Sequence, residues 1–185
     1  GAASAAVFVD FYRRTIQRQV AITLQGVQHQ PGNPFAGHEF DGDENACVDF
    51  RYSDSPRLTW WFDHHASAFA SPEERKHFEG DSSGRKFYDP DARSCTKFIA
   101  RVAKERFGWE PGALQDLIDW ADLIDGAQFP SAQFAVELRE PALRIMSVIE
   151  ANRDRDFIPG LIEALGSESI EGVAERPDVR KRFEA

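Results

Sequence analysis

The sequence predicts an α/β fold, in which a parallel sheet with flanking helices is followed by a helical C-terminal segment. Short apolar segments typical of strands alternate with helical patterns as far as about residue 130. These segments are continuously apolar, which favours strands buried on both faces, as in parallel sheets. From Ser131 onward only helical patterns occur. Residues 1–130 are therefore expected to form the α/β domain and residues 131–185 a helical segment.

The strands are predicted where short apolar segments lie between turn-rich stretches. They are Val20–Leu24 (VAITL), Ala46–Phe50 (ACVDF) and Leu58–Phe62 (LTWWF). Trp60 and Trp61 alternate along the third strand, so we expect them to fill the two faces of the sheet rather than to stack on bases. The segments that follow the first and third strands are rich in polar residues, Gly or Pro and are predicted to be loops.

The helices are predicted from apolar spacing and from residues that begin or end helices. Helical spacing favours a helix from Ala3 to about Arg18. Asp89-Pro90 offers a cap and a first-turn proline, and Gly108 offers a stop, so a helix is predicted between them. A further helix is expected from about Pro111 to Leu123. The helices after Ser131 are expected to break near Pro141, Pro159-Gly160, Gly166 and Pro177.

Composition restricts the class of partner. The formal charge of −9 argues against binding to long DNA or RNA, which requires clustered Lys and Arg. A small anionic substrate held through a metal remains compatible, because the ion reverses the local field. The two cysteines, Cys47 and Cys95, cannot form a disulfide framework, which favours the cytoplasm. No apolar stretch approaches the ~20 residues of a membrane helix, so no membrane partner is expected.

Acids and histidines follow two of the predicted strands. Asp49 lies near the end of ACVDF, and Asp63, His64 and His65 follow LTWWF directly. Functional groups of parallel sheets gather beyond the carboxyl ends of the strands. Neighbours on an extended chain point to opposite sides, so the two histidines are expected to serve different roles. Asp63 could hold one imidazole in a fixed tautomer. The alternative is an ordinary polar cluster in a surface loop.

A third acidic element is the segment LIDWADLIDGAQF, residues 117–129. Its acids Asp119, Asp122 and Asp125 are spaced by three residues, so a helix would bring them near one face. Adjacent carboxylates repel each other, and a cation would relieve that repulsion. The alternative is a solvated helix edge whose last acid begins a turn before Gly126.

Together these motifs resemble the DHH phosphoesterases, the superfamily of RecJ-type exonucleases, oligoribonucleases and family II pyrophosphatases. The segment VDF resembles the second motif of the family at Asp49, and DHH resembles the third, from Asp63 to His65. The segment DGAQF resembles the fourth at Asp125, and GAASAAVF, residues 1–8, resembles the end of the first. The resemblance therefore spans residues 1 to about 129.

The resemblance implies a centre with two divalent ions, Mn²⁺ with Mg²⁺ as the alternative. It implies that Asp49 bridges the ions, that His64 binds one and that Asp125 binds the other. His65 would contact the phosphate or the leaving group, and Asp63 would orient a histidine. Asp122 is the alternative to Asp125. Zn²⁺ is less expected, although Cys47 should point the same way as Asp49 along its strand.

The resemblance further implies that the His and two Asp residues of the first motif precede Gly1 and that a substrate-binding domain follows residues 131–185. The fragment alone is then expected to be inactive. The expected function is hydrolysis of phosphodiester or phosphoanhydride bonds in a small nucleotide, a short oligonucleotide or a related substrate, by an enzyme that could be a homodimer. The alternatives are an inactive DHH-like scaffold with a binding or regulatory role, and a helical interaction module formed by the residues after Ser131.

Several other residues are predicted to have no role in the site. His29, His38 and His77 are expected to be exposed in polar loops, and the basic segment 176–183 to form a solvated helix face. Arg51 and Arg57 flank the second and third motifs, and either could reach a phosphate.

Overall fold

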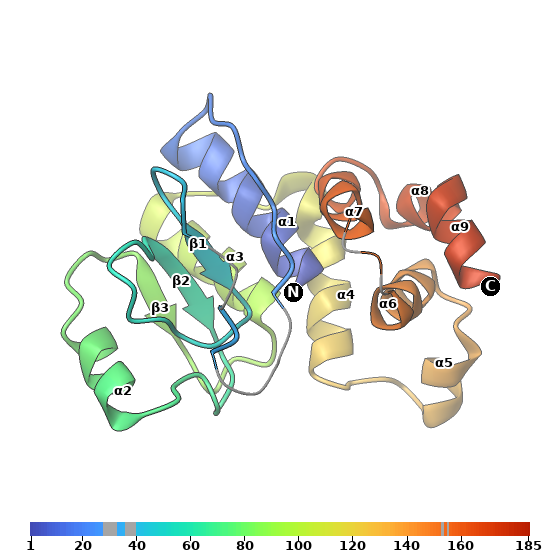
Figure 1. Ribbon diagram of the computed structural model, residues 1–185. Coiled ribbons are helices and arrows are strands. Elements are labelled where there is room, and N and C mark those ends of the chain that lie inside the picture. The colour runs from blue at the N-terminus through green and yellow to red at the C-terminus, as the bar shows by residue number, and fades with distance from the viewer. Residues whose placement is uncertain (28–32, 36–39, 153, 155) are drawn as a thin grey trace.

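The computed structural model describes the chain apart from residues 28–32, 36–39, 153 and 155, so the predictions for His29 and His38 lie outside the described residues. Among the described residues the fold is mixed α/β, with one parallel sheet in the order β1-β2-β3 (Figure 1). The strands are β1 (Ala46–Val48), β2 (Trp60–Asp63) and β3 (Lys86–Tyr88). The predicted fold class, a parallel sheet with flanking helices, is therefore observed, with a sheet of three short strands.

Helices precede the first strand and lie between the later ones, and after β3 the described elements are helices alone. The described helices are α1 (Ala2–Phe11), extended by a π-helical turn η1 (Tyr12–Ile16), α2 (Pro72–Glu79), α3 (Cys95–Phe107), a 3₁₀ turn η2 (Gly112–Leu114), α4 (Gln115–Asp125), α5 (Ala132–Glu137), α6 (Pro141–Ala151), α7 (Phe157–Leu165), α8 (Ile170–Glu175) and α9 (Pro177–Phe183). The expectation of helices alone after Ser131 is confirmed for the described residues.

The central strand β2 is buried on both faces. Trp60 and Phe62 belong to the large apolar cluster that contains residues of α1 and α3. Trp61 belongs to a second cluster on the opposite face, together with Tyr52 and, from α2, Phe78. The prediction that the adjacent tryptophans fill different faces is confirmed. A strand covered on both sides needs no polar alternation, which explains its continuously apolar sequence.

The first turn of α3 lies later in the chain than predicted. Ser94 caps the helix by accepting a hydrogen bond from the Lys97 amide, and Gly108 ends it with a left-handed φ of 69°. The predicted start at Asp89-Pro90 is wrong. The Asp89 amide donates to the Asp63 carbonyl, and the Asp89 carboxylate accepts from the Asp91 amide, so these residues form a turn between β3 and α3.

Three other predictions are wrong. Val20–Leu24 forms no strand; instead, Val20 and Leu24 pack partly buried against the large cluster, and this packing accounts for their apolar character without a strand partner. The segment predicted as a polar loop contains α2, capped by Ser71, and the short edge strand β3. Pro159-Gly160 does not interrupt a helix. Pro159 lies in the first turn of α7, where a backbone N–H would have no hydrogen-bond partner within the helix.

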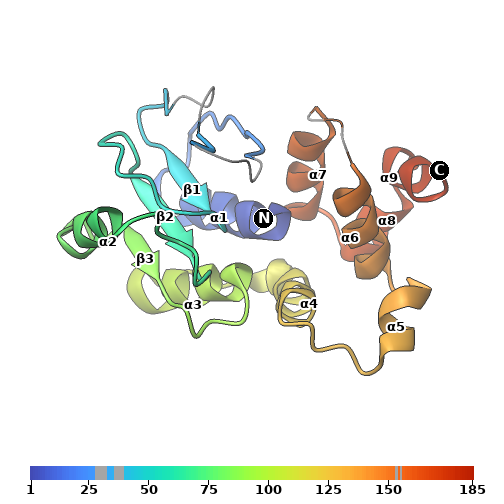
Figure 2. The same ribbon diagram turned by 60° about the horizontal axis from the view of Figure 1, so that its bottom comes forward.

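The C-terminal helices lie on the far side of α1 and α4 from the sheet (Figure 2). Helix α7 packs against α1, while α6 packs against α8 and α9. None of the helices in the described part of the chain combines the length and the apolar character that crossing a membrane requires.

Candidate metal centre

Three predicted ligands meet at the carboxyl end of the sheet. Asp49 follows β1, His64 follows β2, and Asp125 is the last residue of α4. The Nε2 atom of His64 lies 3.6 Å from Asp49 Oδ1 and 3.3 Å from Asp125 Oδ2. Segments far apart in the sequence thus bring two carboxylates to one imidazole nitrogen.

Asp49 is fixed by its backbone and by α1. Its φ of 57° is left-handed, a conformation that Asp adopts more readily than most residues, and its amide donates to the Phe62 carbonyl. Ser4 Oγ donates to Asp49 Oδ2 over 3.4 Å and shares a 2.9 Å hydrogen bond with Thr96 Oγ1. The Gly1 ammonium lies 2.7 Å from the same carboxylate oxygen.

The orientation of His64 follows from one backbone contact. Its Nδ1 lies 2.8 Å from the Ala92 carbonyl oxygen, which can only accept, so Nδ1 carries the proton. In the neutral ring Nε2 is then an unprotonated acceptor directed at Asp49 and Asp125. Among the described residues neither His64 Nε2 nor Asp49 Oδ1 has a hydrogen-bond partner, although both atoms are buried. A buried lone pair facing carboxylate oxygens is unfavourable on its own and is satisfied by a cation between them.

The two histidines do not point to opposite sides, contrary to the prediction. Their ring centroids lie 4.4 Å apart. Strand β2 ends at Asp63, whose Oδ1 accepts from the amides of both histidines, so the chain turns and the alternation of an extended strand no longer applies. Their partners differ: His65 Nδ1 lies 2.6 Å from Asp63 Oδ1, while His64 faces Asp49 and Asp125.

Burial and neighbouring charges oppose each other in this cluster. The pKa of Asp125 is raised by burial and by the charge of Asp49. Burial lowers the pKa of His65, but the hydrogen bond and charge of Asp63 raise it above its ordinary value.

The structure separates the three acids of α4. Asp125 reaches the cluster, whereas the buried Asp122 is held by Arg93, Ser94 and Lys97 of the neighbouring chain segment. Asp119 is exposed and accepts a hydrogen bond from Gln115. Asp125 is therefore better placed than Asp122 for the role of metal ligand.

The donor atoms suit a divalent cation. Asp49, His64 and His65 each offer a ligand atom, and these atoms lie within 4.8 Å of one another, with Asp125 beside them. Carboxylate oxygens and imidazole nitrogens are common ligands of divalent cations. Cys47 is buried in the second apolar cluster, and burial, with the charges of Asp63 and Asp49, raises its pKa to about 12. Cys47 does not belong to the group of described residues whose ligand atoms gather here.

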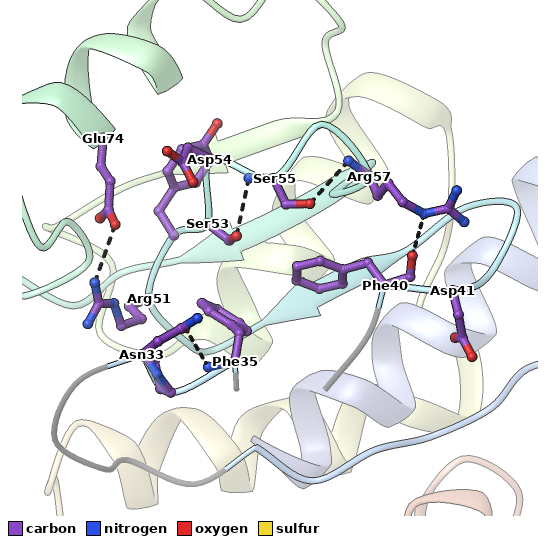
Figure 3. A pocket seen from close by; sticks show the side chains of 12 residues that line it. Asn33, Phe35, Phe40, Asp41, Arg51, Ser53, Asp54, Ser55, Arg57 and Glu74 are labelled. Carbon is purple, nitrogen blue, oxygen red and sulfur yellow. Dashed lines mark hydrogen bonds and ion pairs between the residues drawn. The ribbon is translucent and has the colours of Figure 1, made fainter. Parts of the chain in front are cut away.

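Arg51 and Arg57 line a cavity of about 950 Å³ whose lining contains none of the candidate ligands (Figure 3). Arg51 pairs with Glu74, and Arg57 donates to the carbonyls of Phe40 and Gly42. Asp49 instead lines a second cavity, of about 630 Å³, bounded by residues of α1, β1 and α7. The two arginines are therefore engaged away from the acids and histidines.

Two predictions about residues outside the site, His77 and the basic segment 176–183, are confirmed in part. His77 is exposed, but it lies in α2 rather than in a loop, and its Nδ1 contacts the Tyr52 hydroxyl over 2.9 Å. The basic segment forms α9, in which Arg180, Lys181 and Arg182 occupy the last turn.

Sequence reasoning missed the residues that support the ligands. These are Ser4, Thr96 and the Ala92 carbonyl. A backbone carbonyl leaves no signal in a sequence, and small hydroxyl residues are too common to single out.

No family model matches the chain, and neither a curated protein nor a solved structure matches it.

Proposed function

We propose that this protein is a metal-dependent hydrolase of phosphodiester or phosphoanhydride bonds in a small nucleotide, a short oligonucleotide or a related substrate. The observation that carries the proposal is the unpartnered His64 Nε2 between the carboxylates of Asp49 and Asp125. The proposal also rests on the resemblance to DHH phosphoesterases, whose motifs supply these same residues. The free, buried Cys47 and Cys95 favour the cytoplasm as the place of action.

Asp49, His64 and Asp125 would hold the divalent ions, Mn²⁺ or Mg²⁺. When bound, such ions supply a water that is nucleophilic at neutral pH and neutralise charge on the phosphoryl oxygens. The chain itself supplies orientation. Asp63 accepts from His65 Nδ1 and so fixes the orientation of this half-exposed ring. When the ring is protonated, its Nε2 can donate to a phosphate oxygen or to the leaving group.

Substitution of His64 tests the proposal. We expect His64→Ala to weaken Mn²⁺ binding by more than about 100-fold, because it removes the nitrogen that faces both carboxylates. Titration calorimetry measures the binding, and hydrolysis of bis-p-nitrophenyl phosphate with Mn²⁺ measures the activity. Both are applied to the full-length protein.

His77→Ala is the matched control, since it removes an exposed histidine outside the cluster. Hydrolysis by the complete gene product that survives His64→Ala would contradict the role given to His64. Tight Mn²⁺ binding without hydrolysis of any phosphate ester would instead support the scaffold alternative.

A further inference from the structure

Two cations beside the centre share a single carboxylate. Arg93 Nη2 and Lys97 Nζ lie 2.5 and 3.0 Å from the same oxygen of Asp122, Oδ2, while Ser94 donates to Oδ1. The Asp122 side chain is only 7% exposed, but those of Arg93 and Lys97 are 48% and 49% exposed. One buried carboxylate therefore presents two cationic side chains to solvent.

These cations lie next to the candidate metal ligands. The residue before Arg93 is Ala92, whose carbonyl orients His64. On the other side, a Cβ placed on Gly126 would lie 3.6 Å from the Cβ of Arg93, and Gly126 directly follows Asp125. Arg93 Nη1 also donates to Gln128 Oε1, so the arginine spans the turn that follows Asp125.

One of the two cations is enough to neutralise the charge of Asp122, whose other oxygen accepts from Ser94. The second cation leaves the trio with a net charge of about +1 at the edge of the site. Half-exposed cations held in place by a buried acid keep several N–H donors free for an incoming anion.

We propose that Arg93 and Lys97 bind a second phosphate group of the substrate, beside the phosphate that is hydrolysed. This inference rests on the proposed function and narrows it. The preferred substrate carries a phosphate next to the scissile group, as a 5′-phosphorylated dinucleotide or a chain of linked phosphates does. Arginine supplies a planar pair of donors to that phosphate, and lysine supplies a mobile point charge.

A matched substrate pair tests the proposal in the complete gene product with Mn²⁺. We expect pApA, which has a 5′-phosphate, to be hydrolysed with a higher kcat/KM than ApA, which lacks it. Arg93→Gln and Lys97→Gln should each reduce that ratio by about tenfold, the effect of one charge-assisted contact. Each variant leaves Asp122 one cation and Ser94, so the buried carboxylate stays paired.

Lys104→Gln is the control, because it removes an exposed positive charge from the same helix at a lysine that pairs with Glu110 instead. It should leave the ratio unchanged. A ratio that Arg93→Gln and Lys97→Gln do not alter would overturn the proposal, as would a parent protein that hydrolyses both substrates equally.

A binding measurement separates this inference from the proposed function. Titration with inorganic pyrophosphate in the presence of Mn²⁺ requires no turnover. If no substrate is hydrolysed, the proposed function fails. The role of Arg93 and Lys97 is then decided by the affinity for pyrophosphate alone. Pyrophosphate affinity about tenfold weaker in both variants than in Lys104→Gln supports the anion site. Equal affinity in all variants, or no binding to the parent, overturns it.

Discussion

The two ends of the sheet hold charged clusters of opposite character. At the amino end, Glu44 accepts hydrogen bonds from Tyr12, Trp60 and Arg85 at 2.9, 2.8 and 2.6 Å. At the carboxyl end, the described residues leave buried atoms of Asp49, Asp63 and His64 without partners. The polar cluster at the amino end of the sheet thus has its hydrogen-bond partners, whereas the cluster at the carboxyl end lacks some of them among the described residues.

The difference teaches how to distinguish a structural cluster from a candidate site. Folding favours polar groups whose partners are complete, since each unsatisfied buried group costs about 1–3 kcal/mol. Glu44 fits that description and joins η1 to the beginnings of β2 and β3. At the carboxyl end the described residues do not offset this free-energy cost, which is typical of a site that a bound ion or ligand completes.

The substitution expected to have the largest effect on Mn²⁺ affinity in this comparison is at Asp125. Asp125→Asn should weaken Mn²⁺ binding by about 10–100-fold, because an amide is a poorer ligand than a carboxylate. Since burial and the charge of Asp49 raise the pKa of Asp125, the folded chain disfavours its ionised form at neutral pH. The thermal midpoint of the metal-free variant should therefore stay level or rise. A lower midpoint in differential scanning calorimetry would show that Asp125 is structural.

Glu44→Gln should have the opposite pattern. The amide weakens the three hydrogen bonds, so the free energy of unfolding should fall by about 1–2 kcal/mol. Mn²⁺ affinity should stay unchanged, because Glu44 lies at the other end of the sheet. Urea denaturation and calorimetric titration of the same samples measure both quantities. A weakened Mn²⁺ affinity would mean that the two ends are coupled.

The smallest effect concerns pH. Burial raises the pKa of Glu44, but its three donors outweigh this and hold the pKa below its ordinary value of 4.5. The resulting stabilisation is present above pH 4.5 and is lost as the pH falls through the lower folded-state pKa. The difference in unfolding free energy between the parent and Glu44→Gln should therefore be constant from about pH 7 to 5 and shrink below that range. A difference that grows in acid would contradict this assignment.

The parts of the site that sequence predicts are those encoded locally. An apolar strand followed by Asp63, His64 and His65 is visible in six or seven letters, and the order of the motifs pointed to Asp49 and Asp125. The choice between Asp122 and Asp125 required knowledge of Arg93 and Lys97, which approach Asp122 from the segment that begins α3. No local pattern contains that contact.

The errors in the fold have a similar origin. Val20–Leu24 has the composition of a strand, but a strand also needs a neighbour with free N–H and C=O groups, and composition does not record one. The directions of the two histidines depended on where β2 ends, which Asp63 decides by accepting from both following amides. Both errors thus concern information that the composition of a single segment does not hold.

The adjacent tryptophans of β2 give each layer of the molecule its own optical reporter. Trp60 lies among the rings of α1, and Trp61 lies among Tyr52, Phe69 and Phe78 on the other face. When Trp109 and Trp120 are also replaced by phenylalanine, a variant that keeps only Trp60 or only Trp61 fluoresces from one face alone. Whether the two faces melt together or in succession can therefore be followed within one strand, one residue apart.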